Sequence, residues 1–163
     1  MWLHHDIAHL ASNAIYGSLV LGLALGRYGL GIGLLGGLLG GVVGNLLGFW
    51  YRTGLDYTGL GASGMVMSGL GMLAAQSVAW WRHGVSATRF VLPGLFAGGF
   101  LFLQLGTSPG SDVIAHLGGF LAGLIYGGVA VWLPERIRIA VNRPAAGVFL
   151  LLSGIAWAMA LSR

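Results

Sequence analysis

Six apolar segments follow one another along this chain, and each is close to the length that crosses a membrane. They cover roughly Ile7–Leu25, Leu30–Trp50, Leu60–Trp81, Phe90–Leu105, Val113–Leu133 and Ala145–Leu161. A helix of about 20 apolar residues spans the hydrocarbon core of a bilayer. Charged residues make up only 7% of the chain, whereas a soluble domain carries about 25%. The sequence therefore predicts an all-α, polytopic membrane helical bundle of about six transmembrane helices, with residues 1–163 forming a single domain.

The arginines indicate how the chain is threaded through the bilayer. The connections after the first, third and fifth segments hold Arg27, Arg82, Arg89, Arg136, Arg138 and Arg143, and the opposite side holds Arg52 and Arg163. Because arginine is enriched in cytoplasmic loops, the first set is expected in the cytoplasm. These side chains are scattered singly between apolar segments, so we expect them to anchor the topology and to bind no nucleic acid.

Three short polar groups of residues interrupt the apolar segments. They are His9 with Asn13, the run Gly61–Gly64, and His116 with the glycines that follow it. Each lies a few residues inside the start of the first, third or fifth segment. In a chain that threads back and forth, all three enter from one side, which the arginines make the outer side. Polar groups are costly inside a membrane, so their matched depth predicts a function.

Ser63 and His116 are the predicted reactive pair. Peptide hydrolysis needs a nucleophile, a base that takes its proton, and donors for the oxyanion. Gly61 and Gly64 leave room beside Ser63 for a substrate carbonyl, and a helix starting here would leave the Ser63 amide free to donate. Asp112 lies at the membrane boundary, which favours a dyad over a triad. Alternatively, Ser63 is a small residue at a helix interface, and His116 is a proton relay, a metal ligand or a hydrogen-bond partner of a neighbouring helix.

His9 and Asn13 lie one turn apart on one helical face, and both side chains can donate hydrogen bonds. They therefore suit an oxyanion hole. A zinc site is the alternative, because three neutral imidazoles can bind zinc and leave a position open for catalysis. Its ligands would come from His4, His5, His9 and His116, with Asp6. No His-Glu-x2-His pattern is present and Ser63 would then have no role, so we expect neither a metal nor a cofactor.

Glycine makes up 31 of the residues and recurs at the spacing of helix faces. Two such faces occur in the second segment, at Gly29, Gly33, Gly37 and Gly41 and at Gly36, Gly40, Gly44 and Gly48. In the fifth segment Gly119, Gly123 and Gly127 lie on the face of His116, and the third segment offers Gly64, Ser68 and Gly71. Small residues let helices approach closely in lipid. Such packing would bring His116 within reach of Ser63.

The order and helix placement of these motifs resemble the rhomboid family of intramembrane serine proteases. The resemblance rests on Trp2-Leu3-His4-His5-Asp6-Ile7-Ala8-His9-Leu10-x2-Asn13, on Gly61-Ala62-Ser63-Gly64, and on Ala115-His116-Leu117-Gly118-Gly119-Phe120-Leu121-Ala122-Gly123. It implies that Ser63 is the nucleophile and His116 its partner, and that His9, Asn13 and the Ser63 amide bind the oxyanion. It also gives His4 a structural role. The implied substrates are membrane proteins with a transmembrane helix, cleaved in the lipid bilayer near its outer interface.

Three departures from the family pattern follow from the same comparison. The resemblance implies that the first core helix of the family and its Trp-Arg loop are missing from this sequence, and that the sixth segment is an extra C-terminal helix. Met67 stands where many members have an aromatic residue against the catalytic histidine, and it can still pack there as a flexible apolar surface. The fourth segment is short. We expect a multi-pass protein of a bacterial inner (cytoplasmic) membrane, with no prediction of oligomeric state.

The sequence is also compatible with two other functions. One is a non-catalytic rhomboid-like protein that binds membrane clients and directs their folding or degradation. The other is a small channel or transporter that uses the histidines as a proton path.

Overall fold

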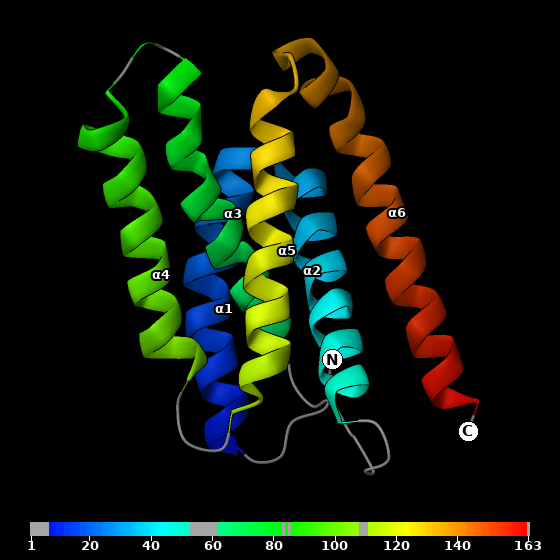
Figure 1. Ribbon diagram of the computed structural model, residues 1–163. Helices are drawn as coiled ribbons and strands as arrows, with labels where there is room; N and C mark the ends of the chain where they lie inside the picture. Colours follow the sequence, from blue (N-terminus) through cyan, green and yellow to red (C-terminus); the bar gives the residue numbers. More distant parts are fainter. Residues whose placement is uncertain (1–6, 53–61, 83, 85, 108–110, 163) are drawn as a thin grey trace.

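The computed structural model describes residues 7–52, 62–82, 84, 86–107 and 111–162. Within these ranges it forms six α-helices and one π-helical turn (Figure 1). They are α1 (Ile7–Tyr28), α2 (Leu30–Tyr51), α3 (Ser63–Arg82), η1 (Ala87–Val91), α4 (Leu92–Gly106), α5 (Val113–Trp132) and α6 (Glu135–Leu161). The all-α architecture expected from the apolar segments is confirmed.

Four of the helical segments are long and apolar enough to cross a membrane. They are Leu30–Tyr51, Thr88–Gly106, Val113–Trp132 and Glu135–Leu161. Among the described residues, α1 and α3 do not meet this criterion, and these two helices carry the polar side chains at positions 13 and 63. The apolar side chains of a membrane bundle face lipid, which accounts for the many exposed leucine, isoleucine and phenylalanine residues.

The predicted start of the last segment was wrong. We expected it at Ala145 after a break containing Pro144, but α6 begins at Glu135 and continues through the proline. Proline removes one backbone donor from a helix interior and bends the helix, yet it does not have to end it. The fourth span also begins earlier than expected, at Thr88, because the π-helical turn η1 leads directly into α4.

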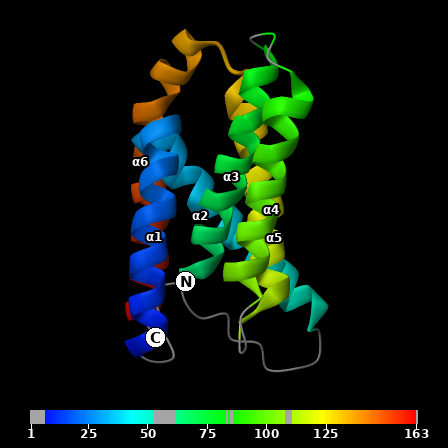
Figure 2. The ribbon, with the colours of Figure 1, turned by 90° about the vertical axis from the view of Figure 1, so that its left-hand side faces the viewer.

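Helices α1, α3 and α5 run in one direction and α2, α4 and α6 in the other (Figure 1). The starts of α1, α3 and α5 therefore meet at one end of the bundle, as the threading argument predicted. Helix α3 packs against α1, α2, α4 and α5, so the helix that carries Ser63 is surrounded by other helices (Figure 2). This arrangement places the first turn of α3 between its neighbours.

Small residues let α3 and α5 approach at backbone distance. A Cβ atom added to Gly119 would lie 2.6 Å from the carbonyl oxygen of Gly64, and one added to Gly127 would lie 2.7 Å from the Cα of Met72. Between these two contacts, Gly123 faces the backbone of Ser68. The predicted glycine face of α5 is thus confirmed, and it faces α3.

Helix α2 closes the same core from the other side. The hydroxyl of Ser68, which is fully buried, donates to the Gly36 carbonyl at 2.9 Å. Gly40 contacts the same serine side chain, and Gly44 contacts the backbone of Ala115 on α5. Ser68 therefore lies where α2, α3 and α5 meet, one turn and a residue beyond Ser63.

Candidate functional site

Ser63 is the first residue of α3, and the chain before it defines how the helix starts. The carbonyl oxygen of Ala62 accepts from the N–H of Met65 at 2.9 Å and from that of Val66 at 3.2 Å. Ser63 therefore occupies the first helical position, where the backbone N–H has no acceptor within the helix. That N–H points toward the start of the helix, where the helix dipole favours negative charge. The Ser63 N–H, which was predicted to donate to an oxyanion, therefore lies at a helix start.

The Ser63 hydroxyl lies 2.8 Å from Nε2 of His116, which is within hydrogen-bond range. His116 is on the first turn of α5 and is only 6% exposed. Asp112 is the N-cap of this helix: its side chain accepts from the Ala115 N–H at 3.1 Å, and its carbonyl accepts from the His116 N–H at 2.9 Å. The structure thus brings together the two residues that were predicted to react.

The other ring nitrogen of His116 is held by backbone. Nδ1 lies 2.7 Å from the carbonyl oxygen of Gly106, the last residue of α4. A carbonyl can only accept, so Nδ1 carries the proton, and in the neutral ring Nε2 is then free to accept from the Ser63 hydroxyl. The last carbonyls of a helix lack partners within it, which leaves this one available. A dyad without an acid was predicted, but this orienting carbonyl was not.

Three buried apolar side chains lie one helical turn from residues of the site. Met67, Phe102 and Phe120 each follow or precede a site residue by four positions: Ser63, Gly106 and His116 respectively. All three belong to one buried cluster, and the two phenylalanine rings lie 5.1 Å apart. Met67 is 3% exposed in this cluster, whereas its packing on the imidazole ring stays a prediction.

Helix α1 brings Asn13 to the same level as Ser63. A Cβ atom added to Gly17 would lie 3.4 Å from the Val66 side chain, and α1 and α3 are parallel. One turn earlier along both helices, Asn13 therefore lies beside the start of α3. Its Nδ2 is buried and has no hydrogen-bond partner among the described residues. A buried donor without a partner costs about 1–3 kcal/mol, so this amide is available for an oxyanion.

Other predicted site residues are described only in part. His9 lies within α1, but its side chain is outside the described set, as are His4 and Gly61 altogether. The alternative zinc site also depends on His4, His5 and His9. Within the described part of the chain, no three histidine, cysteine or acidic residues gather to hold a metal ion. Gly64 packs against the backbone of Gly41 on α2.

An ion pair ties the end of α2 to the start of α5. Nη2 of Arg52 lies 3.5 Å from Oδ1 of Asp112, the same oxygen that caps α5. Arg52 is also the C-cap residue of α2, directly after its last turn. The pair therefore fixes the turn from which His116 projects, although an ion pair this exposed contributes only about 0–1 kcal/mol.

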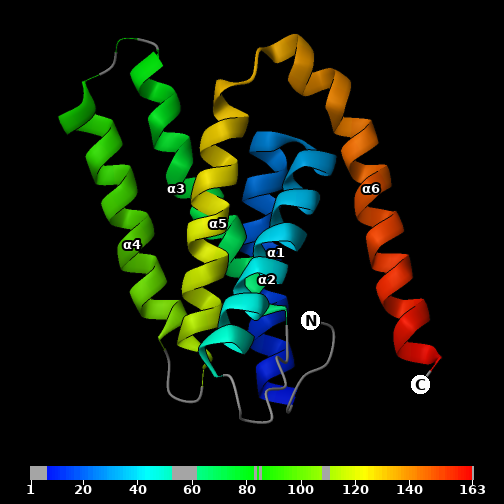
Figure 3. The ribbon, with the colours of Figure 1, turned by 45° about the vertical axis from the view of Figure 1, so that its right-hand side comes forward.

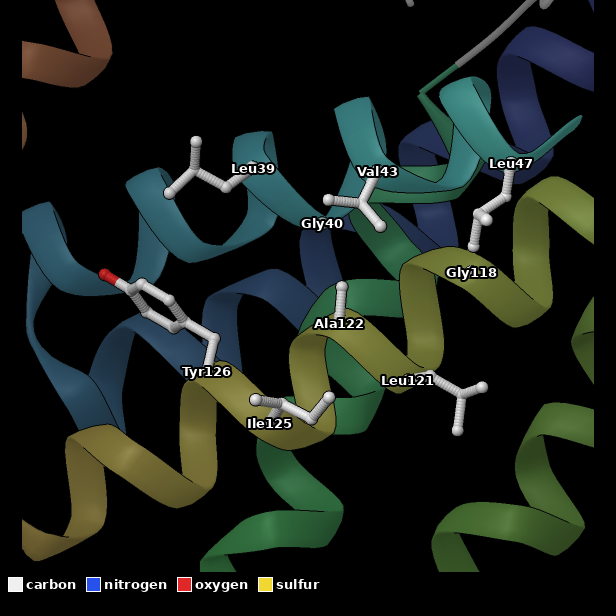
Figure 4. A pocket seen from close by; sticks show the side chains of 9 residues that line it. All are labelled: Leu39, Gly40, Val43, Leu47, Gly118, Leu121, Ala122, Ile125 and Tyr126. Atoms are coloured by element: carbon white, nitrogen blue, oxygen red, sulfur yellow. The ribbon is translucent and has the colours of Figure 1, made fainter. Parts of the chain in front are cut away.

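A separate hollow of about 420 Å³ lies between α2 and α5 (Figure 4). Its lining is almost wholly apolar and consists of Leu39, Gly40, Val43, Leu47, Gly118, Leu121, Ala122, Ile125 and Tyr126. None of the dyad residues lines it, and the one side-chain hydroxyl among its lining residues is that of Tyr126. The candidate site is therefore the dyad at the start of α3 and α5.

Comparison with known proteins adds two matches. The family model of the rhomboid domain matches residues 1–133. A protein of Arabidopsis thaliana, RHOMBOID-like protein 4, is 32% identical over 171 aligned residues, which cover 98% of this chain and 41% of that protein. The chain thus spans less than half the length of this curated relative. No solved structure matches the chain.

Proposed function

Because this chain belongs to the rhomboid family, we propose that it is an intramembrane serine protease with a Ser63–His116 dyad. The observation that carries the proposal is the pair of hydrogen bonds on one imidazole ring, to Ser63 at 2.8 Å and to the Gly106 carbonyl at 2.7 Å. A histidine that only joined two helices would not need a serine at a helix start as its partner. The four apolar spans make the chain an integral, multi-pass membrane protein.

The geometry supports a two-step acyl transfer. The Ser63 oxygen attacks the carbonyl carbon of the scissile bond while its proton moves to Nε2 of His116. The imidazolium that forms is stabilised through its Nδ1–H by the Gly106 carbonyl. His116 then returns the proton to the leaving amine as the C–N bond breaks. Water, deprotonated by the same nitrogen, attacks the ester and releases the acid product and Ser63.

Negative charge on the tetrahedral intermediate needs donors that are in place before the reaction. The Ser63 N–H is at the first position of α3, and Nδ2 of Asn13, which has no partner in the described part of the chain, lies at the same level. We assign both to the oxyanion hole, together with His9 on the turn before Asn13. Of these three donors, the structure describes the Ser63 N–H and Nδ2 of Asn13 but not the His9 side chain.

The rhomboid family acts on membrane-protein substrates within the lipid bilayer. In this chain the dyad lies at the end of the bundle opposite the arginine-rich turns, which supports a cut near the outer interface under the positive-inside rule. A substrate helix must unwind there, because a helical peptide bond hides its carbonyl. Small or helix-weakening residues near the cut are therefore expected in substrates. Location in a bacterial inner membrane stays a prediction.

A fluorophosphonate probe tests whether Ser63 is an activated nucleophile. We expect the purified protein in detergent to be labelled at Ser63, with labelling abolished in Ser63→Ala. Ser162→Ala is the matched control, because that exposed serine near the end of α6 donates only to a backbone carbonyl of its own helix. Equal labelling of the wild type and Ser63→Ala would refute the dyad. A folded wild type that takes no label would favour the non-catalytic rhomboid-like function instead.

Asn13→Ala is expected to slow cleavage of a model membrane substrate by about 10²–10³-fold, the usual cost of losing one oxyanion donor. The loss should appear in kcat, because the donor acts on the transition state. Asn45→Ala on α2 provides the matched control, since it removes the same amide at the same end of the bundle. If the two variants cleave at the same rate, Asn13 has no part in the oxyanion hole.

A further inference from the structure

The arginine-rich end of the bundle gathers charge at one corner, where α6 begins beside the turn between α1 and α2. The Asn142 side chain of α6 accepts from the backbone N–H of Gly31 at 2.6 Å and of Ile32 at 3.1 Å. These bonds fix the second turn of α6 against the start of α2. Arg27, at the end of α1, lies only four residues before Gly31.

Three further arginines lie on this first part of α6. Arg138 is one turn before Asn142, Arg143 follows it, and Arg136 is near the helix start. Because Asn142 bonds to Gly31 and Ile32, the α6 turn that carries Arg138 lies beside the end of α1 that carries Arg27. Glu135 is the acid in the first turn of α6, so the described charges here sum to four positive against one negative. The corner is strongly positive.

The length of α6 places this part at the membrane surface. Its 27 residues extend about 40 Å at 1.5 Å per residue, whereas the hydrocarbon core is about 30 Å thick. About seven residues therefore lie outside the core, which is close to the stretch before Pro144. Figure 3 shows the first turns of α6 crossing over the top of the bundle before the rest descends away from it.

Apolar side chains alternate with the arginines on this stretch. Ile137 is 46% exposed, Ile139 67% and Val141 37%, beside Arg136, Arg138 and Arg143. Ile139 follows Arg136 by three residues and precedes Arg143 by four, so these three side chains share one face of the helix. Exposed apolar side chains beside arginine suit the boundary between the headgroups and the acyl chains.

We propose that this corner binds the phosphate of an anionic phospholipid, held by Arg27, Arg138 and Arg143, with Ile139 in contact with its acyl chains. We infer an anionic lipid from the positive charge, because a cluster of arginines next to a transmembrane helix is typical of anionic-lipid binding. The positive-inside rule requires only that arginines stay on one side. A site that retains one lipid class needs arginines from two helices near each other, and the hydrogen bonds of Asn142 hold the start of α6 beside the end of α1.

Native mass spectrometry of the full chain tests this, with detergent-solubilised protein and equal amounts of phosphatidylglycerol and phosphatidylcholine. We expect the wild type to retain phosphatidylglycerol preferentially. Replacing Arg27, Arg138 and Arg143 together by glutamine should abolish the preference, and Arg138→Gln alone should reduce it about fivefold. Arg138→Lys should keep most of it, which separates loss of charge from loss of fold.

Arg89→Gln is the matched control, because it removes one exposed arginine at the same end of the bundle but beside α4 (Figure 1). It should leave the preference unchanged. Equal loss in Arg89→Gln and Arg138→Gln would show that only overall charge matters and would overturn the site. Displacement of phosphatidylglycerol by millimolar inorganic phosphate would also overturn it, because the site would then take free phosphate.

Discussion

His116→Ala is expected to abolish cleavage of a model membrane substrate, with a loss in kcat on the order of 10⁴-fold or more. The serine hydroxyl donates to Nε2 of this ring at 2.8 Å, and we see no other base at its side among the described residues. Without the imidazole, the hydroxyl stays protonated and is a poor nucleophile. The measurement is single-turnover cleavage in reconstituted vesicles, with thermal unfolding as the check on folding.

The same loss should appear in Ser63→Ala, and the double variant should be no slower than either single one. Residues that act as a unit are non-additive, because removing either member already removes the whole function. Additive losses would mean that Ser63 and His116 act in separate steps. A His116→Ala variant that kept a tenth of the activity would show that another base activates Ser63.

The placement of the site could be predicted from the sequence because it depends on periodic features. Alternating spans bring the starts of α1, α3 and α5 to one end. Glycines at four-residue spacing predict the close face, and Gly119 indeed lies against Gly64, the residue after Ser63. Each of these features depends only on residue type and spacing, and the sequence contains both.

The carbonyl that orients His116 could not be predicted in this way. Any residue presents a backbone carbonyl, so Gly106 carries no signal for this role in the sequence. The same holds for the pairing of Arg52 with Asp112, which depends on where α2 ends and α5 begins. Pro144 gave the wrong boundary for α6, because a proline breaks some helices and only bends others.

Gly119→Ala should separate the two helices of the dyad by adding a single methyl group. The new Cβ would lie 2.6 Å from the Gly64 carbonyl oxygen, and that contact is with backbone, which cannot turn aside. Helix α5 or α3 must therefore shift. Overpacking of this kind costs about 1–3 kcal/mol of stability. A displacement of about 1 Å in the reacting groups costs about 10²-fold in rate.

Gly128→Ala supplies the matched control on the same helix. A Cβ atom there meets nothing within 4 Å, so the change adds the same methyl group without a clash. Cleavage and fluorophosphonate labelling should both fall in Gly119→Ala and stay unchanged in Gly128→Ala. Because Gly119 touches the residue after Ser63 and lies three residues after His116, the loss in rate should exceed what the loss of folded protein explains. Normal activity and stability in Gly119→Ala would mean that the close contact of α3 and α5 does not set the Ser63–His116 distance.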